Sequence, residues 1–150
     1  MSLNSQIKSI VNNLSPDATY MLQSYFNANL ESHGVELDKM PIVVLDNTIT
    51  KDGQIMKNNN LQLNTRVVLR FLQLDDVSNT DEEREDIRQA MEDLALRVLV
   101  NMYQIENVRI LTGNQSFRII PVFNAFNTNL TGVMLEVSLN ENVIISFCDE

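Results

Sequence analysis

Side chains that commonly carry out chemistry are scarce in this sequence and lie far apart along it. There is one histidine, His33, and one cysteine, Cys148, so histidine and cysteine alone cannot form a zinc site and no disulfide can form within the chain. His33 precedes Gly34, a pair typical of a helix C-terminus, where a partial positive charge is favourable. Cys148 carries no signature of a reactive thiol. We therefore expect no catalytic residue and no cofactor at either position.

Acidic residues gather at one place in the chain, where Asp75 and Asp76 precede a longer acidic run that begins at Asp81. Carboxylate oxygens are the ligands that Mg²⁺ and Ca²⁺ prefer, but the spacing of an EF-hand loop is absent. The favoured interpretation is a helix start, because Thr80 and Glu83 form a capping-box pattern and acidic side chains stabilise a helix N-terminus. A less favoured hypothesis, ranked third after the two functions given at the end of this subsection, is an enzyme that holds a metal ion at Asp75, Asp76 and Asp81.

Other catalytic and nucleotide-binding patterns are missing. No serine stands in a G-x-S-x-G motif, and no glycine-rich phosphate loop occurs in a chain that has only four glycines. Twenty acidic and eleven basic residues give a formal charge of −9, which argues against a general nucleic-acid binder. The length of 150 residues suits a single domain, 1–150. Composition thus predicts a soluble acidic domain that is not an enzyme.

The first 34 residues are predicted to be helical. Apolar residues from Leu3 to Leu14 recur at the spacing of one helical face. Ser15, Pro16 and Asp17 then match a helix start, with a capping hydroxyl, a proline at the first helical position and an acid in the first turn. A second helix is therefore expected to run to about residue 32.

The middle of the chain predicts strands. Residues 41–45 form a short apolar run with β-branched side chains, and residues 61–74 alternate between apolar and polar side chains. Asp52-Gly53 is predicted to be a turn and 58–60 a loop. Leu72 and Leu74 fall on the polar side of the long strand, so either a bulge shifts the phase or another part of the chain covers that end.

A long helix over about residues 80–103 is the most strongly patterned element, because its apolar residues follow helical spacing. The last third predicts strands at 108–111, 117–123, 133–139 and 143–147, with a tight turn at 140–142. Pro121 favours an edge position or a bulge for its strand. Strands grouped around one long helix predict an α+β fold, an antiparallel sheet in the 41–150 part with that helix packed on one face.

The alternation also predicts a core and a surface. The residues expected to be mostly buried are Ile42, Val44, Val67, Leu69, Phe71, Ile87, Met91, Leu94, Val98, Leu135 and Val137. Four apolar residues interrupt the polar strand faces and are the candidate interface residues: Val68, Leu72, Leu74 and Met134. The helices before residue 34 are the other candidate contact. Arginines at 66, 70, 109 and 118 could form a small basic stripe, although solvated strand cations are the commoner explanation.

The sequence from residue 41 onward resembles small neck and tail-completion proteins of tailed bacteriophages, in particular tail terminators and connector-ring proteins. The resemblance is carried by PIVVL at 41–45, VVLRFL at 67–72, the acidic-started helix that ends LALRVL at 94–99, and FNAFNTNLTGV at 123–133 before a strand pair and Cys148. The ending is similar to those of phages that infect Bacteroidetes, including crAss-like phages, and the 19 asparagines are compatible with such a source. Residues 1–40 have no counterpart in this pattern.

This resemblance implies a structural protein whose copies form a ring of six or twelve subunits at the neck or tail of a virion. The expected partners are further copies of the chain and the portal, connector or tail-tube proteins, with DNA passing through the ring without specific binding. Assembly is expected in the cytoplasm of the host bacterium, because the chain shows no leader and no membrane anchor. The alternative hypothesis is a small adaptor or regulatory binding module of a mobile element.

Overall fold

The fold combines two described helices with a seven-stranded sheet, so the predicted α+β class is confirmed. The computed structural model describes residues 3–23, 41–46, 50–57, 59–75, 78–104, 108–110, 117–125 and 130–144. Its elements in chain order are α1 (Leu3–Leu14), β1 (Thr19–Gln23), β2 (Ile42–Asp46), β3 (Thr50–Ile55), β4 (Asn60–Leu74), α2 (Asp81–Tyr103), β5 (Val108–Ile110), β6 (Phe117–Ala125) and β7 (Leu130–Ile144).

Two long strands, β4 and β7, form the spine of the sheet. They pair antiparallel and in register along their whole length, from Asn60 opposite Ile144 to Leu74 opposite Leu130. Along the edge of β4 that does not pair with β7 lie β2 and β3. Along the edge of β7 that does not pair with β4 lie β5 and β6. The outermost pair, β1 with β2, is parallel, so the expectation of a wholly antiparallel sheet is wrong at that pair.

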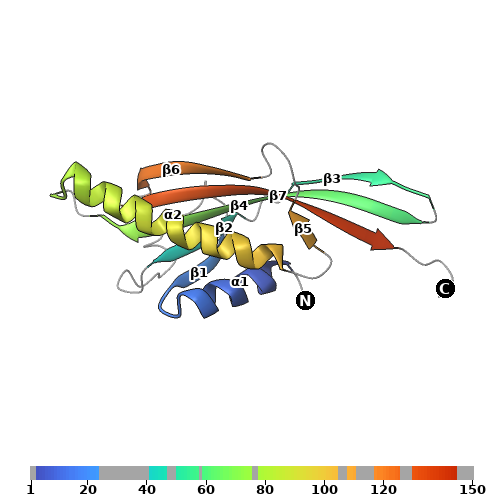
Figure 1. Ribbon diagram of the computed structural model, residues 1–150, viewed down its shortest axis with the longest axis horizontal. Coiled ribbons are helices and arrows are strands. Elements are labelled where there is room, and N and C mark those ends of the chain that lie inside the picture. Colours follow the sequence, from blue (N-terminus) through green and yellow to red (C-terminus); the bar gives the residue numbers. More distant parts are fainter. Residues whose placement is uncertain are drawn as a thin grey trace.

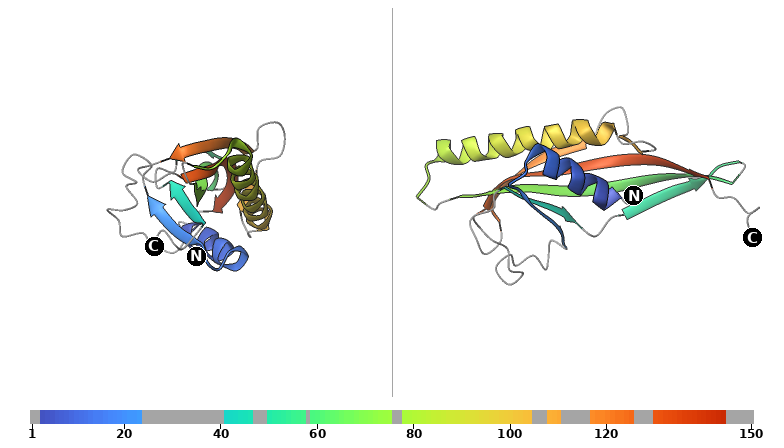
Figure 2. Two further views of the ribbon diagram at one scale, coloured as in Figure 1. Left: turned by 90° about the vertical axis from the view of Figure 1, so that its left-hand side faces the viewer. Right: turned by 90° about the horizontal axis from the view of Figure 1, so that it is seen from below.

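Helix α2 lies across one face of the sheet, and α1 packs beside it on the same face (Figure 1; Figure 2). The predicted capping box is present, since the Thr80 hydroxyl accepts a hydrogen bond from the Glu83 backbone N–H and the Glu83 side chain accepts one from the Thr80 backbone N–H. These bonds satisfy two backbone donors that a helix start would otherwise leave unpaired, which fixes where α2 begins.

The main core lies between the helices and the sheet. The buried side chains of α2 that face the sheet are Met91, Ala95, Val98, Leu99 and Met102. Against them pack the odd-numbered residues of the spine, because alternate side chains of a strand point to the same face: Val67, Leu69, Phe71, Val133, Leu135, Val137 and Leu139. All predicted core residues are buried except Ile87 and Leu94, which are only partly buried.

The predicted second helix after α1 is wrong in the described part, since residues 19–23 form strand β1. Ser15 belongs to the end of α1, because its backbone N–H donates to the Val11 carbonyl. A turn then follows, and the Thr19 backbone N–H bonds the Pro41 carbonyl next to β2. The Tyr20 hydroxyl donates to Asn4 Oδ1 at 2.7 Å and ties β1 to α1. Pairing with β2, distant in sequence, thus overrides the local helical pattern; residues 24–40, which include His33, lie outside the described residues.

Two predicted turns are also wrong. Asp52 and Gly53 lie within β3 and pair with Asn64 and Leu63 of β4. The chain reverses later, around Asn59, whose φ of 61° is the left-handed conformation that asparagine tolerates. The loop predicted at 58–60 agrees with this at Asn59, whereas Asn60 already belongs to β4. Residues 140–142, expected to turn, continue β7 and pair with 62–64 of β4. The strand predicted at 143–147 is therefore the end of β7 as far as Ile144.

The face of the sheet away from the helices carries a second apolar cluster, made of Ile42, Val44, Leu72 and Leu130. Pairing between β4 and β7 shows no register shift near Leu72, so no bulge changes the phase of β4. The second of the two sequence alternatives therefore holds at Leu72, which is covered by this cluster, whereas Leu74 is exposed at the end of the strand. For β6 the prediction of an edge position or a bulge is confirmed by the edge position, since β6 pairs with β7 alone among the described strands. Its register also shifts between Val122 and Ala125, just after Pro121.

Candidate functional site

The four candidate interface residues do not form one exposed patch. Leu72 is fully buried in the second apolar cluster, so it is not part of a surface in this fold. Val68 and Met134 are partly buried, and Leu74 is 46% exposed at the end of β4. The face away from the helices therefore offers less apolar surface than its sequence pattern predicts.

A different part of the sheet has little cover. Strand β3, with residues 60–66 of β4 and 138–144 of β7, forms a ribbon whose base, at Leu139, is buried in the main core and whose far end projects beyond the C-terminal end of α2 (Figure 2). Every side chain of β3 is exposed. At the tip of the ribbon Ile55 is 86% exposed and Met56 is 48% exposed. This surface could not be predicted from the sequence, because β3 has one apolar side chain, at its last residue, and carries no alternating pattern.

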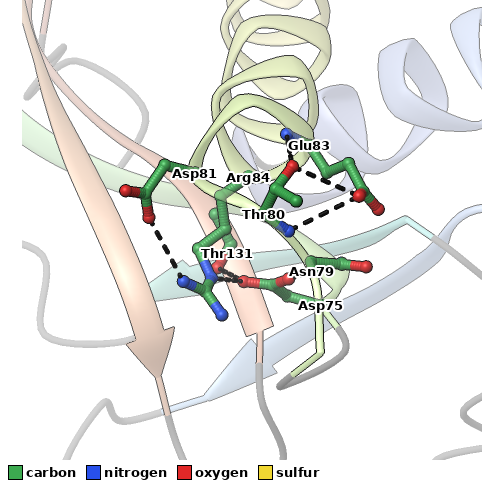
Figure 3. Close-up of polar contacts among 7 residues, drawn as sticks. All are labelled: Asp75, Asn79, Thr80, Asp81, Glu83, Arg84 and Thr131. Atoms are coloured by element: carbon green, nitrogen blue, oxygen red, sulfur yellow. Dashed lines mark hydrogen bonds and ion pairs between the residues drawn. The ribbon is translucent and has the colours of Figure 1, made fainter.

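The acidic residues near the start of α2 form a structural joint between three elements. The carboxylate of Asp75, just after β4, accepts hydrogen bonds from Asn79 Nδ2 at 2.7 Å, Arg84 Nε at 2.8 Å and Thr131 Oγ1 at 2.7 Å (Figure 3). Its side chain is fully buried, whereas that of Arg84 is 24% exposed. Asp81 is fully exposed and lies 3.8 Å from Arg84.

These contacts set the charge of the joint. Burial alone would raise the pKa of the Asp75 carboxyl, but the hydrogen bonds from Thr131, Asn79 and Arg84 outweigh burial and lower it. The carboxylate is therefore ionised and its oxygens are occupied by protein donors, one of which is a cation. Within the ranges that the structure describes, no three acidic, histidine or cysteine side chains gather as metal ligands would. Asp76 and Cys148 lie outside those ranges.

The predicted basic stripe is divided into two ion-paired groups. Arg70 lies 3.4 Å from Asp46 across the β2–β4 pair. Arg66 and Arg118 both donate to Oε2 of Glu136, at 2.5 Å and 2.9 Å, from strands β4 and β6 on either side of β7. The hydrogen bond from Arg118, together with that from Arg66, lowers the pKa of Glu136 against the opposing effect of burial. The side chain of Arg109 lies outside the described residues.

Neither of the two described helices is both long and apolar enough to cross a membrane. The candidate functional site consists of three surfaces described above, namely the ribbon tip, the sheet edges and the Arg66–Glu136–Arg118 group. No known protein family matches the sequence, and no curated protein is detectably similar to it.

Proposed function

We propose that the protein is a structural component of a tailed-phage virion, where its copies assemble into a ring at the head–tail neck or at the tail end. The resemblance of its motifs to tail terminators and connector-ring proteins gives the proposal its direction. The observation that carries it is the ribbon, which leaves the helix-covered part of the molecule and ends in the exposed side chains of Ile55 and Met56.

The physical argument concerns what covers such a ribbon. Burying apolar surface contributes about 25 cal/mol of favourable free energy per Å². Because the Ile55 side chain is 86% exposed, moving it from water into a contact with a neighbouring subunit would stabilise the assembly. Among the described strands β3 pairs with β4 alone, and a strand edge without a pairing partner offers backbone donors and acceptors to a neighbour. A neighbouring copy that receives the ribbon supplies both kinds of contact, and the interface must bury more than about 1,000 Å² to be stable.

The charge of the chain suits the same role. A net charge of −9 keeps a channel from binding DNA phosphates, because phosphate binding depends on lysine and arginine displacing counterions. In this proposal DNA passes the ring without a specific contact, and the remaining partners are the portal, connector or tail-tube proteins of the same virion.

The direct test is the size and shape of the assemblies. Mass photometry and negative-stain imaging of the purified protein, alone and with the products of neighbouring genes, should reveal closed rings of six or twelve subunits. Neighbouring genes that encode portal and tail proteins would agree with this result. A protein that stays monomeric at every concentration and in every such mixture would favour the alternative, a small adaptor or regulatory module of a mobile element.

Two matched variants connect the assembly to the ribbon. Ile55→Lys with Met56→Lys should leave the fold intact by circular dichroism and abolish the rings. Val100→Lys is the control, because Val100 is 60% exposed and belongs to α2, not to the ribbon. Rings that tolerate the ribbon variant would show that the ribbon is not the contact.

A further inference from the structure

A hollow of about 370 Å³ opens on the face of the sheet away from the helices. It is lined by Arg66, Phe117, Arg118, Glu136 and Ser138. Successive side chains of a strand point to opposite faces of the sheet. Val67 and Val137 pack in the core beneath α2, so their neighbours Arg66 and Glu136 point to the face away from the helices, where the hollow lies. Arg118 shares that face because it is the register partner of Glu136.

The hollow carries an excess of positive charge. Both guanidinium groups donate to the same oxygen of one carboxylate, so two cations face one anion and a net charge of +1 remains. The Glu136 side chain is only 16% exposed, whereas those of Arg66 and Arg118 are 57% and 64% exposed. Each guanidinium has five N–H donors, most of which stay available to a second acidic group. On a chain of charge −9, this is a local positive site.

The opposite charge lies on the other face of the molecule, at the start of α2. Asp81, Glu82 and Asp86 are exposed there, and the link of Asp81 to Arg84 is long at 3.8 Å. The helix dipole favours acidic side chains in the first turn, which holds Asp81 and Glu82. The carboxylates at the start of α2 are thus the complement that the chain itself provides for the arginine hollow.

We propose that the Arg66–Arg118 hollow binds the carboxylates at the start of α2 of a second copy of this chain. Because the hollow and the acidic helix start lie on opposite faces of the sheet, one neighbour cannot occupy both. Each copy therefore gives its helix to one neighbour and receives the helix of another, which is a head-to-tail contact that closes into a ring or extends as a filament. This inference rests on the proposed function and identifies a contact that ring assembly uses.

The test neutralises each side of the contact separately. Arg66→Gln with Arg118→Gln keeps a hydrogen-bond donor beside Glu136 but removes both charges, and Glu82→Gln with Asp86→Asn does the same for the helix. Each pair should weaken assembly at least tenfold in mass photometry without changing the circular dichroism spectrum. The matched control, Lys8→Gln with Arg97→Gln, removes two exposed charges elsewhere and should assemble normally.

A cross-link locates the contact independently of affinity. Arg118→Lys keeps the positive charge and supplies an amine, which a carbodiimide couples to a carboxylate held next to it. Mass spectrometry of mixed heavy- and light-labelled protein should find residue 118 joined to Glu82 or Asp86 of a different copy. A cross-link from residue 118 to Glu136 of the same copy is expected in either case, because the two side chains are neighbours across β6 and β7. Cross-links between different copies that join residue 118 to other positions, or rings that survive the arginine double substitution, overturn this inference while the ring proposal stands. An absence of assembly in every mixture overturns both.

Discussion

Thr131 donates a 2.7 Å hydrogen bond to Oδ2 of Asp75, although 56 residues separate the two in the chain. The bond lies next to the last register pair of the spine, Leu74 with Leu130. Because Arg84 of α2 donates to the same oxygen, one buried carboxylate joins the end of β4, the start of β7 and the start of the helix that covers them. Asp75, one of the three acids considered as metal ligands, instead holds the helix layer and the sheet together.

Removing the carboxylate should therefore destabilise the fold. Asp75→Ala leaves Arg84 without its buried partner and the buried Thr131 hydroxyl without its acceptor, so we expect a loss of about 3 kcal/mol in the free energy of unfolding. Urea denaturation measures it. Asp81→Ala is the control, because it removes the exposed partner of the same arginine and should leave the urea midpoint almost unchanged.

The same joint predicts a dependence of stability on pH. Folding lowers the pKa of Asp75 from its ordinary value of 3.8, so between the two pKa values the unfolded chain binds a proton that the folded chain does not. The contribution of Asp75 is complete above the unfolded pKa and is lost as the pH falls through the folded pKa. In thermal melts from pH 7 to 2, Asp75→Asn should give a shallower acid limb than the parent protein. Glu136, whose pKa is also lowered, keeps that limb from becoming flat; identical curves for the two proteins would contradict the assignment.

Gly132 should not tolerate a side chain. A Cβ there would lie 1.8 Å from the Phe71 carbonyl oxygen, because β4 and β7 approach each other closely at this point. Gly132→Ala forces the strands apart and should cost about 3 kcal/mol. Gly53→Ala is the comparison, since the nearest atom to its Cβ, at 2.8 Å, is the end of the flexible Leu63 side chain. Equal unfolding midpoints for the two variants would show that the backbone contact is not limiting.

The two sides of α2 should respond differently to truncation. Met102 is fully buried against the sheet, so Met102→Ala should cost about 2–5 kcal/mol. Val100, two residues earlier and 60% exposed, should lose less than about 0.5 kcal/mol on replacement by alanine. Guanidinium denaturation of both variants checks which face of the helix carries the core.

The sequence and the structure place Leu72 of β4 in different environments. The sequence pattern placed it on an assembly surface, whereas the structure buries it with Ile42, Val44 and Leu130. Leu72→Lys should therefore unfold or strongly destabilise the monomer, because an isolated ammonium group enters an apolar cluster. Circular dichroism that shows a stable, folded variant would return Leu72 to the surface.

Elements with strong local signals could be predicted from the sequence. The capping box fixed the start of α2 in advance, and the alternation of β4 marked its buried face, because both patterns depend on neighbours a few residues away. Strands β1 and β3 could not be predicted in this way. The polar β3 is a strand only because it pairs with residues 61–66, and β1 only because it pairs with β2.

The candidate site was harder to predict for the same reason. The sequence indicated the arginines at 66 and 118, but only the register of β4, β7 and β6 brings both to one carboxylate. The acidic residues near the start of α2 are evident in the sequence. The role of Asp75, however, depends on Thr131, which comes 56 residues later in the chain, after α2. Spacing along the chain therefore identified the charged residues and not their partners.

The spine has a consequence for how fast the protein folds. β4 and β7 pair over fifteen residues each, yet α2, β5 and β6 lie between them in the chain. The entropy of closing that long loop is lost before the strands gain from pairing, and such nonlocal topologies refold in about milliseconds to seconds rather than microseconds. Helix α2 and the β3–β4 hairpin depend on local contacts, so we expect the search that brings residues 60–74 to 130–144 to limit the refolding rate.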